Sequence, residues 1–131
     1  MQTGTQTATA SKQMLWTGRV ISALPVLMLF FGGVMAFMKP PIVLQTMAHL
    51  GYPERLVVPA GILEIVCALI YAIPRTSVFG AVLLTAYFGG ATATHVRIGE
   101  PFFAPVLFGI LVWIGLYLRE ERLRELVPIR K

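Results

Sequence analysis

The sequence predicts an all-α, polytopic membrane protein: an antiparallel bundle of four transmembrane helices with a short interfacial helix between spans one and two. Two observations predict this class. Hydrophobic residues make up 56% of the chain and charged residues only 13%, a balance that soluble domains of this length do not show. Four apolar stretches, at residues 17–38, 56–73, 76–96 and 102–118, each approach the ~20 residues that a helix needs to cross ~30 Å of hydrocarbon.

The segment before the first span, residues 1–15, is polar and rich in small residues, without helical periodicity. We expect it to be a disordered cytoplasmic extension rather than a signal peptide, because the apolar run that follows is long enough to remain as a span. The first span contains Pro25, which favours a kink, and a Gly32-Gly33 pair, which admits a close neighbour. The following segment, 42–56, has the spacing of a short helix lying at the outer interface.

The later spans differ in composition. Pro74 ends the second span, and the connection to the third is so short that the two must be antiparallel neighbours. The third span is dense in Gly, Ala and Thr, which predicts the helix most surrounded by protein. The fourth is almost wholly apolar, which predicts a lipid-facing helix with an aromatic belt at Trp113 and Tyr117. The transmembrane domain thus covers residues 16–119, and residues 120–131 form a basic cytoplasmic tail.

Basic residues are distributed unevenly across this four-span scheme. One side holds Lys12, Arg19, Arg75, Arg119, Arg122, Arg124, Arg130 and Lys131, and the other holds Lys39, Arg55 and Arg97. Because Lys and Arg are retained on the cytoplasmic side, both termini are predicted to be cytoplasmic. The net charge of +5 is then a signal for topology and anionic lipid, and without an aromatic-interleaved basic patch it does not indicate a nucleic-acid partner.

Glu64 lies near the centre of the apolar run LVVPAGILEIVCALIYAIP. A carboxylate in hydrocarbon is unfavourable by at least a few kcal/mol, so Glu64 should face protein or water and is a candidate functional group. Cys67, Ala68 and Tyr71 follow it at helical spacing and complete a face that looks into the bundle. Two interpretations remain open: Glu64 binds a ligand head group or handles a proton, or it is a hydrogen-bonded core residue that joins spans two and three.

Polar residues of the third span fall near this carboxylate. At ~1.5 Å per residue, Glu64 is about 12 Å from the outer end of its span, level with Thr92, so a hydrogen bond between the two is within reach. His95 and Arg97 lie nearer the surface and, with Glu100, fit either an outward-facing polar site or a pair of interfacial anchors. We therefore take Glu64, Thr92, His95 and Arg97 as the candidate ligand-binding residues.

Several kinds of chemistry find no support in the sequence. The single cysteine, Cys67, excludes an intrachain disulfide and a CxxC redox pair. His49 and His95 lack a third metal ligand, so no metal site is predicted. No nucleophile and base pair or phosphate-binding glycine loop is present, so no catalytic residue is assigned and the chain is not expected to act as an enzyme on its own.

Three segments carry a resemblance to a known family. GILEIVCALIYAIPRT, GAVLLTAYFGGATATHVRIGEP and PVLFGILVWIGLYLREERLREL are similar to the DoxX-like family of small bacterial membrane proteins, and the similarity covers most of the chain after residue 14. The resemblance implies a four-helix bundle in the bacterial inner membrane, with Glu64 and the ATHVR segment at the family's recurring polar positions. Distant relatives include the small subunit of a thiosulfate:quinone oxidoreductase, so a quinone is the ligand or cofactor that the resemblance implies, and the chain would at most be one subunit of a quinone-linked oxidoreductase.

Two functions of different classes follow. In the first, the chain is an accessory subunit that holds a lipophilic, quinone-like molecule near Glu64 in a cavity lined by Glu64, Thr92 and His95. In the second, it is a purely structural subunit that packs against larger membrane partners or further copies of itself, and no such cavity exists. A transporter or channel is a weaker hypothesis, since four spans with one buried charge offer little lining.

Overall fold

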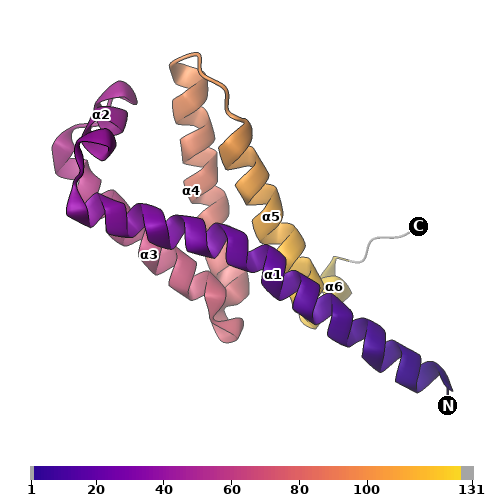
Figure 1. Ribbon diagram of the computed structural model, residues 1–131. Coiled ribbons are helices and arrows are strands. Elements are labelled where there is room, and N and C mark those ends of the chain that lie inside the picture. Colours follow the sequence, from indigo (N-terminus) through magenta and orange to yellow (C-terminus); the bar gives the residue numbers. More distant parts are fainter. Residues whose placement is uncertain (1, 128–131) are drawn as a thin grey trace.

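Every regular element in the described part of the chain is a helix (Figure 1). The computed structural model describes the backbone of residues 2–127 and the side chains of residues 12–127. The α-helices are α1 (Gln2–Met38), α2 (Pro41–His49), α3 (Val57–Ala72), α4 (Ser77–Arg97), α5 (Phe103–Arg119) and α6 (Glu121–Leu126). Single 3₁₀ turns, η1 (Glu54–Leu56) and η2 (Pro74–Thr76), precede α3 and α4.

Three helical segments are long and apolar enough to cross a membrane. They are Lys12–Met38, Glu54–Ala72 and Pro74–Arg97. The fourth apolar helix, α5, is shorter, at 17 residues. The predicted class is therefore confirmed: the protein is an all-helical, multi-pass membrane protein with three to four helices of spanning character.

Helix α1 is longer than the sequence predicted. It begins at Gln2 and continues for 37 residues, so it includes the segment that we expected to be a disordered extension. Once a helix has nucleated, each added residue gains one backbone hydrogen bond, which lets a stable span extend into a polar flank. At its other end the chain leaves the helix through Lys39, whose positive φ of 48° breaks the helical path before Pro40 and redirects the backbone into α2.

The core forms where α1 crosses α3 and α5. Helix α1 packs against both, while α4 packs against α3 and α5 on the other side (Figure 1). Leu84, Val112 and Leu116 are completely buried at the centre. Helix α5 contributes two of these residues and leaves Phe103, Leu107 and Ile110 exposed, so the fourth span has a core face as well as an outward apolar face. The third span is not more enclosed than its neighbours, since the same share, 28%, of an 18-residue apolar stretch is buried in each of the three long apolar segments.

Glycines bring α1 and α5 into backbone contact. A Cβ atom added to Gly115 would lie 3.0 Å from the Ser22 backbone nitrogen and 3.2 Å from the Gly18 carbonyl oxygen. A side chain of any size there would push the helices apart. Small residues let transmembrane helices approach closely enough for extensive van der Waals contact, which is the main attraction between helices in lipid.

Tyr71 connects three helices at the cytoplasmic end predicted from the charges. Its side chain is fully buried, and its hydroxyl lies 2.7 Å from the Val112 carbonyl oxygen of α5 and 2.9 Å from Ser22 Oγ of α1. Arg119 donates from Nη2 to the Tyr71 carbonyl oxygen at 2.8 Å, and its guanidinium lies 4.5 Å from the Tyr71 ring centroid. The polar end of this tyrosine therefore fixes α3 against α1 and α5.

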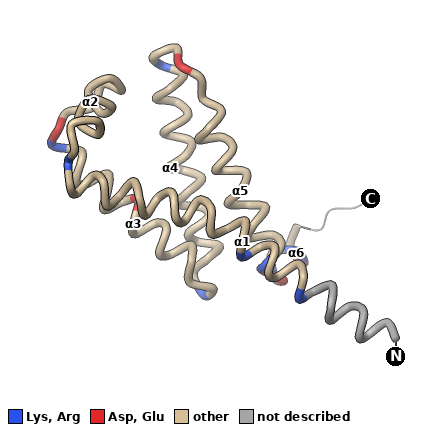
Figure 2. The backbone as a smooth tube through the Cα atoms, viewed as in Figure 1, with Lys and Arg blue, Asp and Glu red and all other residues tan. Residues whose placement is uncertain are grey.

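Charged residues gather at the two ends of the helical bundle, whereas one acidic residue lies within the length of α3 (Figure 2). The first part of the tail is helical and contacts the bundle: in α6, Leu123 is buried and Arg124 donates to the carbonyl oxygens of Tyr117 and Leu118. The last four residues of the predicted basic tail, including Arg130 and Lys131, lie outside the described residues.

Candidate ligand-binding cavity

Glu64 is paired with a tyrosine of the neighbouring helix. The Tyr87 hydroxyl on α4 donates to Glu64 Oε1 on α3 at 2.5 Å. Both side chains are partly buried, so the bond forms where water competes little. A hydrogen bond to an ionised carboxylate is shorter and stronger than a neutral one, which makes this pair the main polar link between α3 and α4.

Helix α1 closes the other side of this carboxylate. A Cβ atom added to Gly32 would lie 2.6 Å from Glu64 Oε2, so only glycine leaves room for the carboxylate there. The predicted close approach at the Gly32-Gly33 pair is therefore present, and the group that approaches is Glu64 itself. Three helices, α1, α3 and α4, fix where its head group lies.

Glu64 lines a cavity of about 710 Å³ between α2, α3 and α4. The lining is mostly apolar. It consists of Ile42, Val43, Thr46, Met47, Leu50, Tyr52, Leu56, Pro59, Ala60, Leu63, Glu64, Ala86, Tyr87, Gly90, Ala91, Thr94 and His95. Of the three residues that we predicted to line one cavity, Glu64 and His95 line this one, and α2, the segment predicted to lie at the interface, supplies one of its walls.

His95 lines this cavity, and a contact with its own helix fixes which nitrogen of the neutral ring carries the hydrogen. Its Nδ1 lies 2.7 Å from the Ala91 carbonyl oxygen of the preceding helical turn. A carbonyl oxygen only accepts, so Nδ1 must carry the proton, and in the neutral imidazole Nε2 is left as an acceptor.

The connection between α2 and α3 is fastened to the end of α4 by polar contacts. Tyr52 Oη lies 2.6 Å from Thr94 Oγ1, and His49 Nε2 contacts Glu100 Oε1. Arg97 donates to the Leu50 carbonyl oxygen, and its guanidinium lies 5.9 Å from the Tyr52 ring centroid. No residue of α2 is buried. These contacts therefore hold α2 over the cavity, and Arg97 positions this wall rather than lining the cavity.

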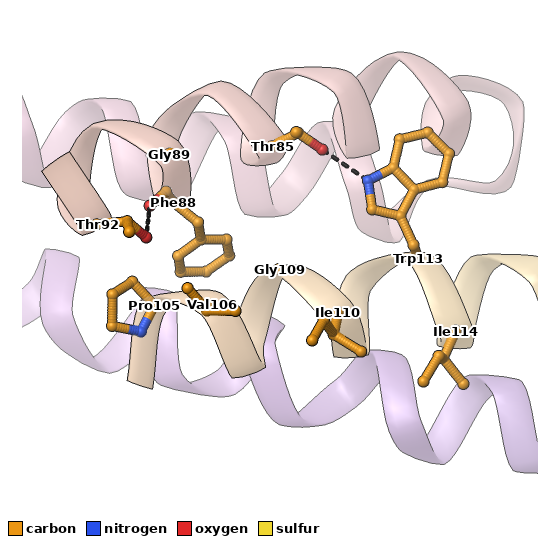
Figure 3. Close-up of a pocket in the computed structure, with 10 residues that line it drawn as sticks. All are labelled: Thr85, Phe88, Gly89, Thr92, Pro105, Val106, Gly109, Ile110, Trp113 and Ile114. Carbon is orange, nitrogen blue, oxygen red and sulfur yellow. Dashed lines mark hydrogen bonds between the residues drawn. The ribbon is translucent and has the colours of Figure 1, made fainter. Parts of the chain in front are cut away.

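Thr92 lies in a different place from the one that we predicted. It lines a separate groove of about 420 Å³ between α4 and α5 (Figure 3). Its hydroxyl donates to the Phe88 carbonyl oxygen at 2.8 Å, and the second threonine of the groove, Thr85, accepts from Trp113 Nε1 at 2.6 Å. The prediction of a hydrogen bond between Glu64 and Thr92 was wrong, because Thr92 faces α5. The residue of α4 that lies beside the Glu64 carboxylate is Tyr87.

From the sequence we did not predict that Tyr87 is the partner of Glu64. A signal was available: Glu64 and Tyr87 are about equally far along the chain from Arg75, in the tight connection between α3 and α4. In an antiparallel helical hairpin, residues equally distant from the turn lie at the same level. We had counted residues from the outer end of each span, and this count placed Glu64 at the level of Thr92 instead of Tyr87.

Among the side chains of residues 12–127, no group of three His, Cys, Asp or Glu is placed to hold a metal ion. The polar groups around the cavity are one carboxylate, one imidazole and four hydroxyls. Such groups bind a ligand by hydrogen bonds.

Fold and cavity together define a small helical membrane protein with a lipophilic cavity built around one intramembrane carboxylate. The family comparison agrees: residues 20–115 match the model of the DoxX-like family, so the chain belongs to that family. The comparisons with curated proteins and with solved structures found no match to this chain.

Proposed function

We propose that this protein binds a small lipophilic molecule of the quinone type in the cavity between α2, α3 and α4. The observation that carries the proposal is the position of Glu64, held by Tyr87 at the wall of an otherwise apolar cavity. An ionisable group within a span is unfavourable unless it is paired or faces a cavity, and such groups mark ligand or proton sites.

The size and lining of the cavity support such a ligand. Its volume of about 710 Å³ falls within the range of small-molecule sites, which combine an apolar wall with a few polar groups that fix orientation. Leu63 and Met47 are among the residues that offer an apolar surface to a ring or chain, and Glu64, Tyr87 and His95 offer hydrogen bonds to a head group. In this proposal Glu64 and His95 contact the ligand, Arg97 holds the wall of the cavity, and Thr92 has no part.

We propose that the protein acts as an accessory subunit in membrane redox metabolism. The groups around the cavity can hold and orient a quinone-like molecule, and a partner in a larger membrane complex, or a further copy of this chain, would use it. The purely structural alternative predicted no such cavity, so with the cavity present it now requires that no ligand occupies it. The same binding experiment therefore decides between the two.

We propose four membrane crossings in the bacterial inner membrane, with both termini cytoplasmic. At ~1.5 Å per residue, α5 is about 26 Å long, close to the ~30 Å of hydrocarbon and within the range that spanning helices show. Cysteines introduced singly as Arg55→Cys and Glu125→Cys in a Cys67→Ala background test this arrangement. In intact cells a membrane-impermeant maleimide should label the first and spare the second, and the reverse pattern would contradict the orientation.

The ligand test is mass spectrometry of small molecules that co-purify with the protein in native lipid. Wild type should retain a quinone-like molecule, and Glu64→Gln, which keeps shape but removes the charge, should deplete it at least severalfold. Thr92→Val is the matched control, since it changes a polar side chain of the adjacent helix outside the cavity. If no lipophilic ligand accompanies wild type, or if both variants retain it equally, the binding-site proposal fails.

A further inference from the structure

The hydrogen-bond donors around the cavity are already in use. The cavity has six polar side chains: Thr46, Tyr52, Glu64, Tyr87, Thr94 and His95. Five of them carry a hydrogen that they can donate in the neutral state, and Glu64, as a carboxylate, carries none. Where each of these hydrogens goes decides what the cavity can offer a ligand.

Three donors are bound to backbone carbonyl oxygens of their own helices. Thr46 Oγ1 donates to Ile42 at 2.7 Å, Thr94 Oγ1 donates to Gly90 at 2.9 Å, and His95 Nδ1 donates to Ala91 at 2.7 Å. Each contact joins a side chain to the carbonyl four residues earlier, so these bonds are local and do not depend on a ligand.

The two tyrosines are committed as well. Tyr87 donates to Glu64 Oε1. The single hydrogen of Thr94 goes to the Gly90 carbonyl, so in the 2.6 Å contact between Tyr52 and Thr94 the tyrosine must be the donor. No polar side chain of the cavity wall therefore has a free donor while Glu64 is ionised and His95 is neutral.

Acceptors, in contrast, remain free. A carboxylate offers about four acceptor positions. Among the described residues Tyr87 fills one of those on Oε1, the second position of Oε1 stays open beside this cavity-lining residue, and Oε2 lies against Gly32 of α1. The Nε2 of neutral His95 is a second acceptor at the cavity wall. A ligand whose polar atoms are acceptors alone would leave these groups without partners, whereas a ligand with a hydroxyl would satisfy them.

From this arrangement we propose that the cavity selects hydroxyl-bearing aromatic lipids, so that it prefers a phenol or a hydroquinone to the corresponding ether or quinone. This inference rests on the proposed function and specifies the chemical class of its ligand. The selection concerns binding alone: a hydroxyl of the ligand donates to Glu64, and the ring lies against the apolar wall.

Two matched probe pairs test the proposal. One pair is para-nonylphenol and its methyl ether, which differ in the hydroxyl hydrogen and are not redox partners. The other is a decyl hydroquinone and its quinone under anaerobic conditions. Affinities are measured by isothermal titration calorimetry with full-length protein in nanodiscs, in alkaline buffer that keeps the carboxyl ionised, with empty nanodiscs as the blank. Wild type should bind each hydroxyl-bearing probe about tenfold more tightly than its partner, as expected for one hydrogen bond to a charged acceptor.

Two variants separate recognition by Glu64 from a structural role. Glu64→Gln introduces an amide donor, so the preference for the hydroxyl-bearing probe should fall to about twofold or less. Tyr87→Phe leaves the carboxylate in place and frees an acceptor, so the preference should persist. A structural role alone would instead weaken both members of each pair equally in both variants. If Glu64→Gln does not fold, the wild-type and Tyr87→Phe comparisons still decide.

The outcomes distinguish this inference from the proposed function. If wild type binds both members of a pair equally, or prefers the ether and the quinone, the selection is refuted while the cavity remains a ligand site. If none of the four probes binds, the cavity is not a site for such lipids and both proposals are overturned.

Discussion

The hydrogen bond between Tyr87 and Glu64 predicts a measurable coupling between α3 and α4. In a double-mutant cycle, Tyr87→Phe and Glu64→Leu each remove one partner, and the difference between the double variant and the sum of the single ones isolates the pair. The 2.5 Å contact and the charged acceptor place the bond in the class of about 1.5–3 kcal/mol. Interhelical hydrogen bonds in membrane proteins average about 0.6 kcal/mol and reach about 1.7. The two ranges overlap near 1.5 kcal/mol, which is the coupling that we expect.

The assay is reversible unfolding in mixed micelles of a mild and a denaturing detergent, followed by circular dichroism. Each single variant also changes desolvation and packing, but these contributions cancel in the cycle. Ser22→Ala combined with Tyr87→Phe is the control cycle, because Ser22 shares no partner with Tyr87 and the two effects should add to within about 0.5 kcal/mol. A coupling below about 0.5 kcal/mol for the Tyr87 and Glu64 pair would refute the inference that this bond joins the two helices.

Three further predictions concern the core. Tyr71→Phe should lower the free energy of unfolding by about 1–2 kcal/mol, since the hydroxyl lies within hydrogen-bonding distance of both α1 and α5. Tyr117→Phe should lower it by less, and equal effects of the two variants in the same micelle titration would count against the role of Tyr71. Cys67, only 3% exposed, should resist a membrane-permeant maleimide in the folded protein and react after unfolding, and rapid labelling of the folded form would place this face outside the core. Gly115→Leu should force α1 away from α5 and lower the midpoint of thermal unfolding far more than Gly90→Leu, a control at a position with no neighbour within contact distance. An unchanged midpoint for Gly115→Leu would show that α1 and α5 do not meet at Gly115.

Composition and hydropathy were sufficient to predict the class of this protein. Apolar runs of spanning length require helices, because in lipid every backbone amide and carbonyl must find its partner within the segment or a closed barrel. The same reasoning singled out Glu64, since a carboxylate in such a run must be accommodated by protein or water. The tight connection at Pro74 fixed α3 and α4 as antiparallel neighbours. All of these conclusions depend on local sequence alone.

The partners of each helix face required the tertiary structure. Sequence spacing places Thr92 and Tyr87 on α4 but does not say which face of α4 meets α3 and which meets α5. The rotation of α4 decides that Tyr87 contacts Glu64 while Thr92 lies in the groove between α4 and α5. The same holds for α5, whose apolar composition suits lipid and core equally, because hydrocarbon and a helix interface do not differ in polarity. The sequence by itself determined that a charge lies within the membrane span. Only the packing of three helices decided which hydroxyl binds it and which cavity it faces.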